Sequence, residues 1–129
     1  MDAGGVLQWV IRAVLAAVFL FMGITHFVPG PARGMAAMIP AALRRPGMPS
    51  AKTLVRFTGV CELAGAVGIL IPATRFTAGI ALVLFLIAVF PANAFTAEHP
   101  EKFGRVAFPF WPRYVAQLAL ILVVLLAIV

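Results

Sequence analysis

Five polar residues stand out because they interrupt long apolar runs and could offer a ligand hydrogen-bond donors and acceptors. They comprise an imidazole, a carboxylate, a hydroxyl and two amides: His26, Glu62, Thr58, Asn93 and Gln117. Thr58 and Glu62 are four residues apart, so they share one face of a helix. An ionisable group within a membrane helix costs at least about 2.5 kcal/mol. We therefore expect Glu62, which lies in the apolar stretch from Thr58 to Pro72, to need a partner from another helix.

Arg12 is a candidate ion-pair partner for Glu62. Arg12, Phe19 and His26 are spaced by seven residues, so they lie on one face of the first helix. Opposed helix directions would place Arg12 and Glu62 within about 6 Å of each other in depth, which an arginine side chain can span. Two alternatives to this ion pair stay open. In the first, the Arg12 side chain extends to the membrane interface. In the second, burial keeps the Glu62 carboxyl group neutral.

The residue types argue against several kinds of site. Cys61 is the single cysteine, which excludes an intramolecular disulfide and a dithiol redox pair. His26, Glu62 and His99 have no local ligand spacing, so we expect no metal site and no bis-histidine haem. We expect no catalytic residues and no reaction by the chain alone. A quinone cofactor needs fewer specific residues than a metal or haem does. An apolar groove with a hydrogen-bond donor and an acceptor is enough, and His26, Glu62 and Asn93 could supply these.

The composition indicates a membrane protein. The chain has 129 residues, of which 64% are hydrophobic and 11% are charged, whereas a soluble domain is about half apolar and about a quarter charged. The net charge of +6 is concentrated in the connections between apolar runs, so we expect no nucleic-acid partner. The predicted fold is an all-α, antiparallel four-helix bundle in the membrane, forming a single domain over residues 1–129.

The apolar runs predict four membrane helices, at residues 6–27, 53–71, 76–95 and 113–129. Residues 28–51 hold five prolines, so no long helix fits there. We expect a short re-entrant or interfacial segment in that connection, seated by its apolar side chains Met35, Met38, Ile39 and Leu43. Pro91 is expected to kink the third helix. The aromatic residues that follow residue 107 predict an interfacial belt.

The basic residues predict the orientation. Eight lie on the side of the two long connections: Arg33, Arg44, Arg45, Lys52, Arg56, Lys102, Arg105 and Arg113. Only Arg12 and Arg75 lie on the side of the termini. Because positive charge stays in the cytoplasm, we expect cytoplasmic long connections and both termini outside. This topology places four of the five polar residues at similar depth, with Glu62 about one turn deeper.

Four short motifs resemble the DoxX family of small bacterial membrane proteins. They are GITHF at 23–27, MIP at 38–40, GVCELAGAVGILIP followed by ATR at 59–75, and AVFPANAF at 88–95. The residues that match the recurrent pattern of that family are Gly23, His26, Phe27, Glu62, Pro72, Arg75, Pro91 and Asn93. The resemblance implies four helices in the bacterial cytoplasmic membrane and association with a redox enzyme or quinone pool. It carries over no catalytic set.

These observations favour an accessory subunit of a membrane redox or quinone system. It would lie in the lipid bilayer and bind a lipophilic ligand or a redox-enzyme partner through the polar residues. A scaffold or assembly factor is the alternative, with a purely structural polar cluster and contacts to a partner or to further copies of the chain. A small transporter or oligomeric pore around Glu62 is the third hypothesis.

Overall fold

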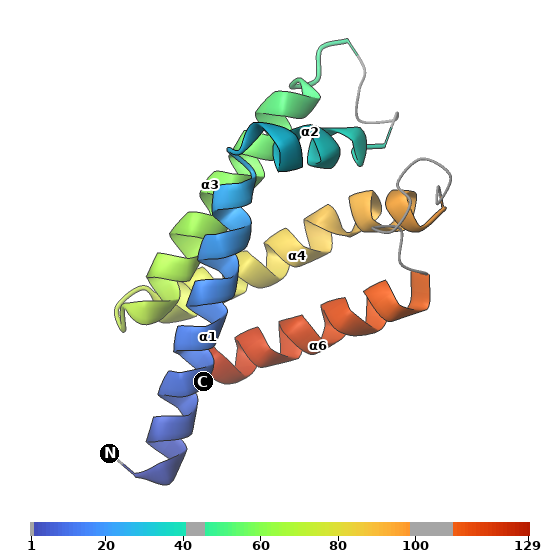
Figure 1. Ribbon diagram of the computed structural model, residues 1–129. Helices are drawn as coiled ribbons and strands as arrows, with labels where there is room; N and C mark the ends of the chain where they lie inside the picture. Colours follow the sequence, from blue (N-terminus) through green and yellow to red (C-terminus); the bar gives the residue numbers. More distant parts are fainter. Residues whose placement is uncertain (1, 41–45, 99–109) are drawn as a thin grey trace.

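The structure is a computed structural model that describes residues 2–40, 46–98 and 110–129, apart from the side chains of residues 93, 96–98 and 110 (Figure 1). It contains the helices α1 (Ala3–Thr25), α2 (Pro29–Ala37), α3 (Ala51–Leu70), α4 (Arg75–Glu98) and α6 (Phe110–Ile128). The described residues form helices and turns without any strand. The expectation of an all-α fold is confirmed.

Four of these helices are long and apolar enough to cross a membrane: Ala3–Thr25, Ala51–Leu70, Arg75–Ala92 and Trp111–Ile128. The chain is therefore a multi-pass membrane protein built as a helical bundle. Each of the four long helices packs against the next long helix along the chain, and α1 also contacts α6. Both ends of the chain lie at one end of the bundle, where the Gln8 side chain donates hydrogen bonds to the carbonyl oxygens of Leu126 and Val129.

Capping residues explain why two helices begin earlier than the apolar runs suggested. Asp2 accepts a hydrogen bond from the backbone N–H of Gly5 at 2.7 Å and caps α1. Ser50 accepts one from the backbone N–H of Thr53 at 3.1 Å and caps α3. Helix α6 begins at Phe110 rather than at Arg113 and includes Pro112 in its first turn. Proline is tolerated there, because the N–H group that it lacks would have no acceptor within the helix.

The first long connection contains the short helix α2, which packs against α3. The fixed backbone angle of Pro29 suits the first helical position. Of the side chains expected to seat this segment, Ile39 is buried, Met35 and Met38 are partly buried, and Leu43 lies outside the described residues. Helix α4 continues through Pro91 to Glu98, so it ends three residues later than predicted.

Glycines set how closely the helices approach. A side chain at Gly23 or at Gly59 would meet the facing helix, because each Cβ would lie 3.2 Å from the other residue's carbonyl oxygen. A Cβ at Gly65 would lie 2.5 Å from Leu82, and one at Gly68 would lie 2.6 Å from Ala78, so these two glycines bring α3 against α4. Gly79 does the same for α4 and α6, where a Cβ would clash with Ile128.

The two helix pairs meet near the chain termini and diverge toward the long connections (Figure 1). Helices α1 and α3 form one pair, while α4 and α6 form the other. The buried apolar core comprises Leu15, Ala16, Phe19, Ala66, Ile69, Ala78, Leu82, Leu86, Val124 and Ala127. Most of these residues come from the halves of their helices that lie nearer the termini, so the other end of the bundle is left open between the pairs.

Candidate functional site

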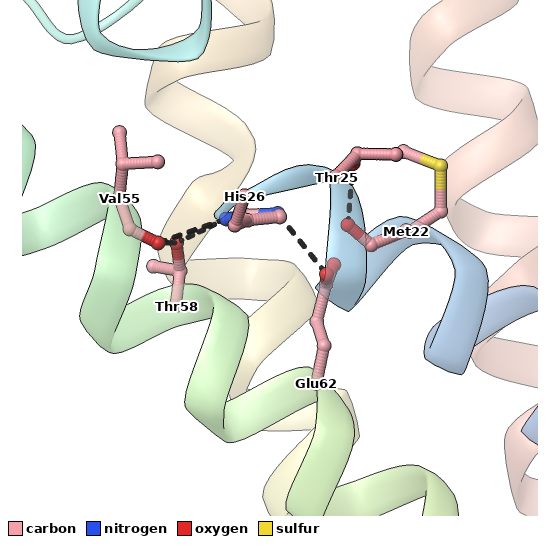
Figure 2. Close-up of polar contacts among 6 residues, drawn as sticks. All are labelled: Met22, Thr25, His26, Val55, Thr58 and Glu62. Carbon is pink, nitrogen blue, oxygen red and sulfur yellow. Dashed lines mark hydrogen bonds and ion pairs between the residues drawn. The ribbon is translucent and has the colours of Figure 1, made fainter. Parts of the chain in front are cut away.

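His26 links the end of α1 to the side of α3 (Figure 2). It is the C-cap of α1, and its backbone N–H donates to the Gly23 carbonyl oxygen at 3.2 Å. The close approach of Gly59 places α3 against the His26 side chain. The ring Nδ1 lies 2.9 Å from the Val55 carbonyl oxygen and 3.0 Å from Thr58 Oγ1. Since a carbonyl oxygen can only accept, Nδ1 carries a proton and donates it.

The other ring nitrogen of His26 faces Glu62. Nε2 lies 3.0 Å from Glu62 Oε2, and the two residues are only 9% and 7% exposed. Because Nδ1 is already the donor to Val55, a single further proton decides the state of the pair. Either the imidazole is doubly protonated beside a carboxylate, or Glu62 is protonated beside a neutral imidazole. The pair has no net charge in both states.

The surroundings of His26, which lies just beyond the first membrane span, favour the charged imidazole. Burial opposes the charge, but the close contact with the negative charge of Glu62 and the hydrogen bond to the Val55 carbonyl outweigh burial and raise the pKa of His26 above its ordinary value. The C-terminal carbonyl groups of α1 also favour a cation at this position. The arrangement therefore indicates an imidazolium–carboxylate pair.

Glu62 keeps an unused capacity to accept a hydrogen bond. Its Oε2 is buried, and no donor among the described residues is well aligned with it, since the 3.0 Å contact with His26 meets the distance but not the angle of a hydrogen bond. A buried oxygen without an aligned donor is costly unless a ligand or water supplies one. A hydroxyl or N–H group placed beside Glu62 would therefore be stabilised.

His26, Thr58 and Glu62 lie on the wall of an open groove between the two helix pairs, with a volume of about 1700 Å³. Most of the other lining residues are apolar, with Arg113 and Thr77 among the exceptions; Met35 of α2 and Met38, its C-cap, also contribute. Helices α4 and α6 supply the facing wall. Methionine side chains are unbranched and adapt to ligands of different shape. The groove can therefore hold a lipophilic molecule whose polar group reaches the His26–Glu62 pair.

The ion pair predicted between Arg12 and Glu62 is not formed, and the reason is the register of α1 against α3. The contact between Gly23 and Gly59 places Arg12 level with Leu70, about 12 Å in depth from Glu62. Arg12 instead donates from Nε to the Ala127 carbonyl oxygen at 2.7 Å. The expectation that Arg12, Phe19 and His26 share one face is confirmed, because all three are buried.

The remaining candidate residues do not join this pair in the described part of the chain. Gln117 lies on α6, half-buried, and makes no hydrogen bond with His26, Thr58 or Glu62. Asn93 lies in α4, but its side chain is outside the described residues, as is His99. Over the described ranges, no group of three or more His, Cys, Asp or Glu side chains could hold a metal ion.

Two contacts, one at each end of the bundle, had no clear signal in the sequence. The Val55 carbonyl oxygen is a backbone acceptor, and only the register of α1 and α3 brings it to His26. At the other end of the bundle, the Trp9 ring contacts the guanidinium groups of both Arg12 and Arg75, whose Cζ atoms are 5.1 and 4.9 Å from its ring centroid. The spacing of Trp9 and Arg12 by three residues could have predicted half of this contact.

Comparison with known proteins identifies the family of the chain but assigns it no function. The family described as "Domain of unknown function (DUF8561)" matches residues 15–128. No curated protein and no solved structure matches the chain significantly. The matched residues run from Leu15 in α1 to Ile128 in α6 and so include His26, Thr58 and Glu62. Because the match covers most of its length, the chain belongs to the DUF8561 family.

Proposed function

We propose that this protein is a membrane-embedded accessory subunit that binds a lipophilic ligand, such as a quinone, beside the His26–Glu62 pair. The observation that carries the proposal is the buried Glu62 Oε2 without an aligned donor, on the wall of an apolar groove. The hydroxyl of a hydroquinone would donate to Glu62, while the isoprenoid tail would lie along the apolar helices. No catalytic step is assigned to the chain itself.

The resemblance to the DoxX family supports a place beside a redox enzyme or a quinone pool. Two of the residues that carry the resemblance, His26 and Glu62, are the ones that form the buried pair. The proposal therefore links the shared motif to a ligand at this position.

The bacterial cytoplasmic membrane is the proposed location, with the long connections in the cytoplasm. The excess of basic residues beside those connections supports this orientation. A C-terminal alkaline-phosphatase fusion should be active, because the enzyme folds only outside the cytoplasm. A C-terminal fluorescent-protein fusion that is bright instead would reverse the orientation.

A scaffold or assembly factor is the second candidate, and one observation favours it. The hydrogen bond from His26 to the Val55 carbonyl and the contact with Glu62 already join α1 to α3. Buried polar groups in membrane bundles often serve only to pair helices. In that case the pair would stabilise the fold, and occupants of the groove would be ordinary lipids.

Native mass spectrometry of protein extracted gently from its own membrane tests the proposal. We expect a bound mass that matches a quinone in the wild type and in Cys61→Ser, which changes the groove wall but not the pair. We expect Glu62→Gln to lose that mass, because the neutral amide accepts a weaker hydrogen bond than the carboxylate. A wild-type protein that carries only phospholipid or only a protein partner would favour the scaffold.

A further inference from the structure

A second polar site lies at the end of the bundle that carries the termini. The guanidinium groups of Arg12 and Arg75 both approach the Trp9 ring, so their Cζ atoms are at most about 10 Å apart. Arg12 belongs to α1, while Arg75 begins α4. Arg12 is only 6% exposed. Two like charges are thus held together in a partly desolvated place, where their repulsion is poorly screened.

Helix ends satisfy part of each guanidinium group. Arg12 Nε donates to the Ala127 carbonyl in the last turn of α6. Arg75 Nε donates to the Ile69 carbonyl at 2.8 Å, and its Nη2 lies 3.4 Å from the Leu70 carbonyl, at the end of α3. These contacts complement the negative ends of two helices. Both Nη groups of Arg12 and Nη1 of Arg75 make no hydrogen bond with any described residue.

Within the part of the chain that the structure describes, no side-chain carboxylate is placed to neutralise the two arginines. The sequence has four acidic residues. Asp2 caps α1 about 15 Å from Arg12, and Glu62 pairs with His26. Glu98 ends α4 roughly 35 Å from Arg75, and Glu101 follows it by three residues in the sequence. An anionic group from outside the chain would therefore be stabilised beside the two arginines.

We propose that Arg12, Arg75 and Trp9 form a binding site for the phosphate group of an anionic phospholipid in the leaflet on the side of the termini. The fork of an arginine side chain matches phosphate oxygens, and basic sites between membrane helices bind acidic lipid headgroups. The N-terminus of α4 at Arg75 adds positive potential. Exposed Val14 and Phe76, close to the two arginines in the sequence, offer apolar surface to the acyl chains.

Trp9 fluorescence measures this binding directly. The chain has two tryptophans, so Trp111→Phe leaves Trp9 as the reporter. This variant is reconstituted in phosphatidylcholine vesicles that contain the same fraction of either brominated phosphatidylglycerol or brominated phosphatidylcholine. We expect the anionic lipid to quench Trp9 with a relative binding constant about fivefold higher. Arg75→Gln should reduce this ratio to about one, whereas Arg12→Lys, which keeps the charge, should retain most of it.

Arg56→Gln is the matched control, because Arg56 is exposed and lies near the opposite end of the bundle. It should leave the fivefold ratio unchanged. Equal quenching by the two lipids, or an equal loss of the ratio in Arg56→Gln, would overturn the site. Inorganic phosphate that abolishes the excess quenching by brominated phosphatidylglycerol would overturn the assignment to a lipid. Circular dichroism checks that each variant is folded. If the Arg12 variant does not fold, the result for Arg75→Gln alone tests the lipid site.

Discussion

The two ends of the bundle hold buried charge in opposite ways. At the end of the long connections, His26 and Glu62 form a pair of opposite charge with a 3.0 Å contact. At the end of the termini, Arg12 and Arg75 carry like charges that both approach one aromatic ring. The first pair is balanced within the chain. The second is offset by helix-end carbonyls and by an aromatic face.

This difference determines what a substitution leaves behind. Removing one member of a balanced buried pair leaves the other as an uncompensated charge in a poorly hydrated place. Removing one of two like charges removes an attraction to partial charges but also relieves a repulsion. We therefore expect the end with His26 and Glu62 to be the more sensitive to single substitutions and the end with the arginines to be the more sensitive to its lipid surroundings.

His26→Leu should have the largest effect on stability. The substitution leaves the Glu62 carboxylate buried without a partner. Breaking a buried pair in this way lowers the free energy of unfolding by about 3 kcal/mol. The free energy of unfolding, measured by steric trapping in bicelles, should fall by that amount. The double variant His26→Leu, Glu62→Leu should be closer to the wild type than the single variant is. A single variant that loses less than about 1 kcal/mol would mean that water reaches Glu62 and that the pair is not a buried one.

Gly59→Ala should come next, because it breaks the register that brings His26 to Glu62. The added Cβ would lie 2.7 Å from His26 Cβ and 2.8 Å from Phe27 Cε2, so α1 and α3 must move apart. Overpacking of this kind costs about 2 kcal/mol. Gly34→Ala is the control, since a Cβ there meets nothing within 4 Å and should leave the melting temperature unchanged or slightly higher. Equal melting temperatures for the two variants would contradict the close approach of the helices.

The fold could be predicted from the sequence because lipid imposes it. Runs of about 20 apolar residues without an alternative use for their backbone polar groups must be helices, and short connections make neighbours antiparallel. Helix starts were harder, because Asp2 and Ser50 extend α1 and α3 beyond their apolar runs. Pro112 wrongly suggested a later start for α6.

The partner of Glu62 could not be predicted, because partners depend on register and register depends on packing. Helix lengths alone allowed Arg12, whereas the contact of Gly23 with Gly59 selects His26. The sequence alone also treats the two arginines separately, with Arg12 as a candidate partner for Glu62 and Arg75 as a charge on the side of the termini. Only the assembled bundle brings Arg12 and Arg75, 63 positions apart in the sequence, to the same tryptophan.

The pH dependence of stability sharpens the comparison between the two ends. The pKa of His26 is raised in the folded protein, so the folded state holds the proton more tightly than the unfolded chain does. The stabilisation is fully present below about pH 6.5, the ordinary pKa of histidine, and is lost as the pH rises through the folded-state pKa. The difference in melting temperature between wild type and His26→Gln should therefore shrink as the pH rises from about 6 to 9. In a Glu62→Gln background this trend should be much weaker.

Trp9→Leu should have the smallest effect on stability and should act only at the end with the arginines. The substitution removes the aromatic face from both guanidinium groups, and each cation–π contact contributes about 0.5–1 kcal/mol. Arg12 and Arg75 keep their hydrogen bonds to helix-end carbonyls, so the loss should stay near 1 kcal/mol. A double-mutant cycle of Trp9→Leu with Arg75→Gln measures the share that belongs to this contact. Trp111→Phe, at the other end, should give no coupling with Arg75→Gln. A cycle in which Trp9 and Arg75 are also uncoupled would reduce the tryptophan to an interfacial anchor, and the two arginines would then depend on helix ends and lipid alone.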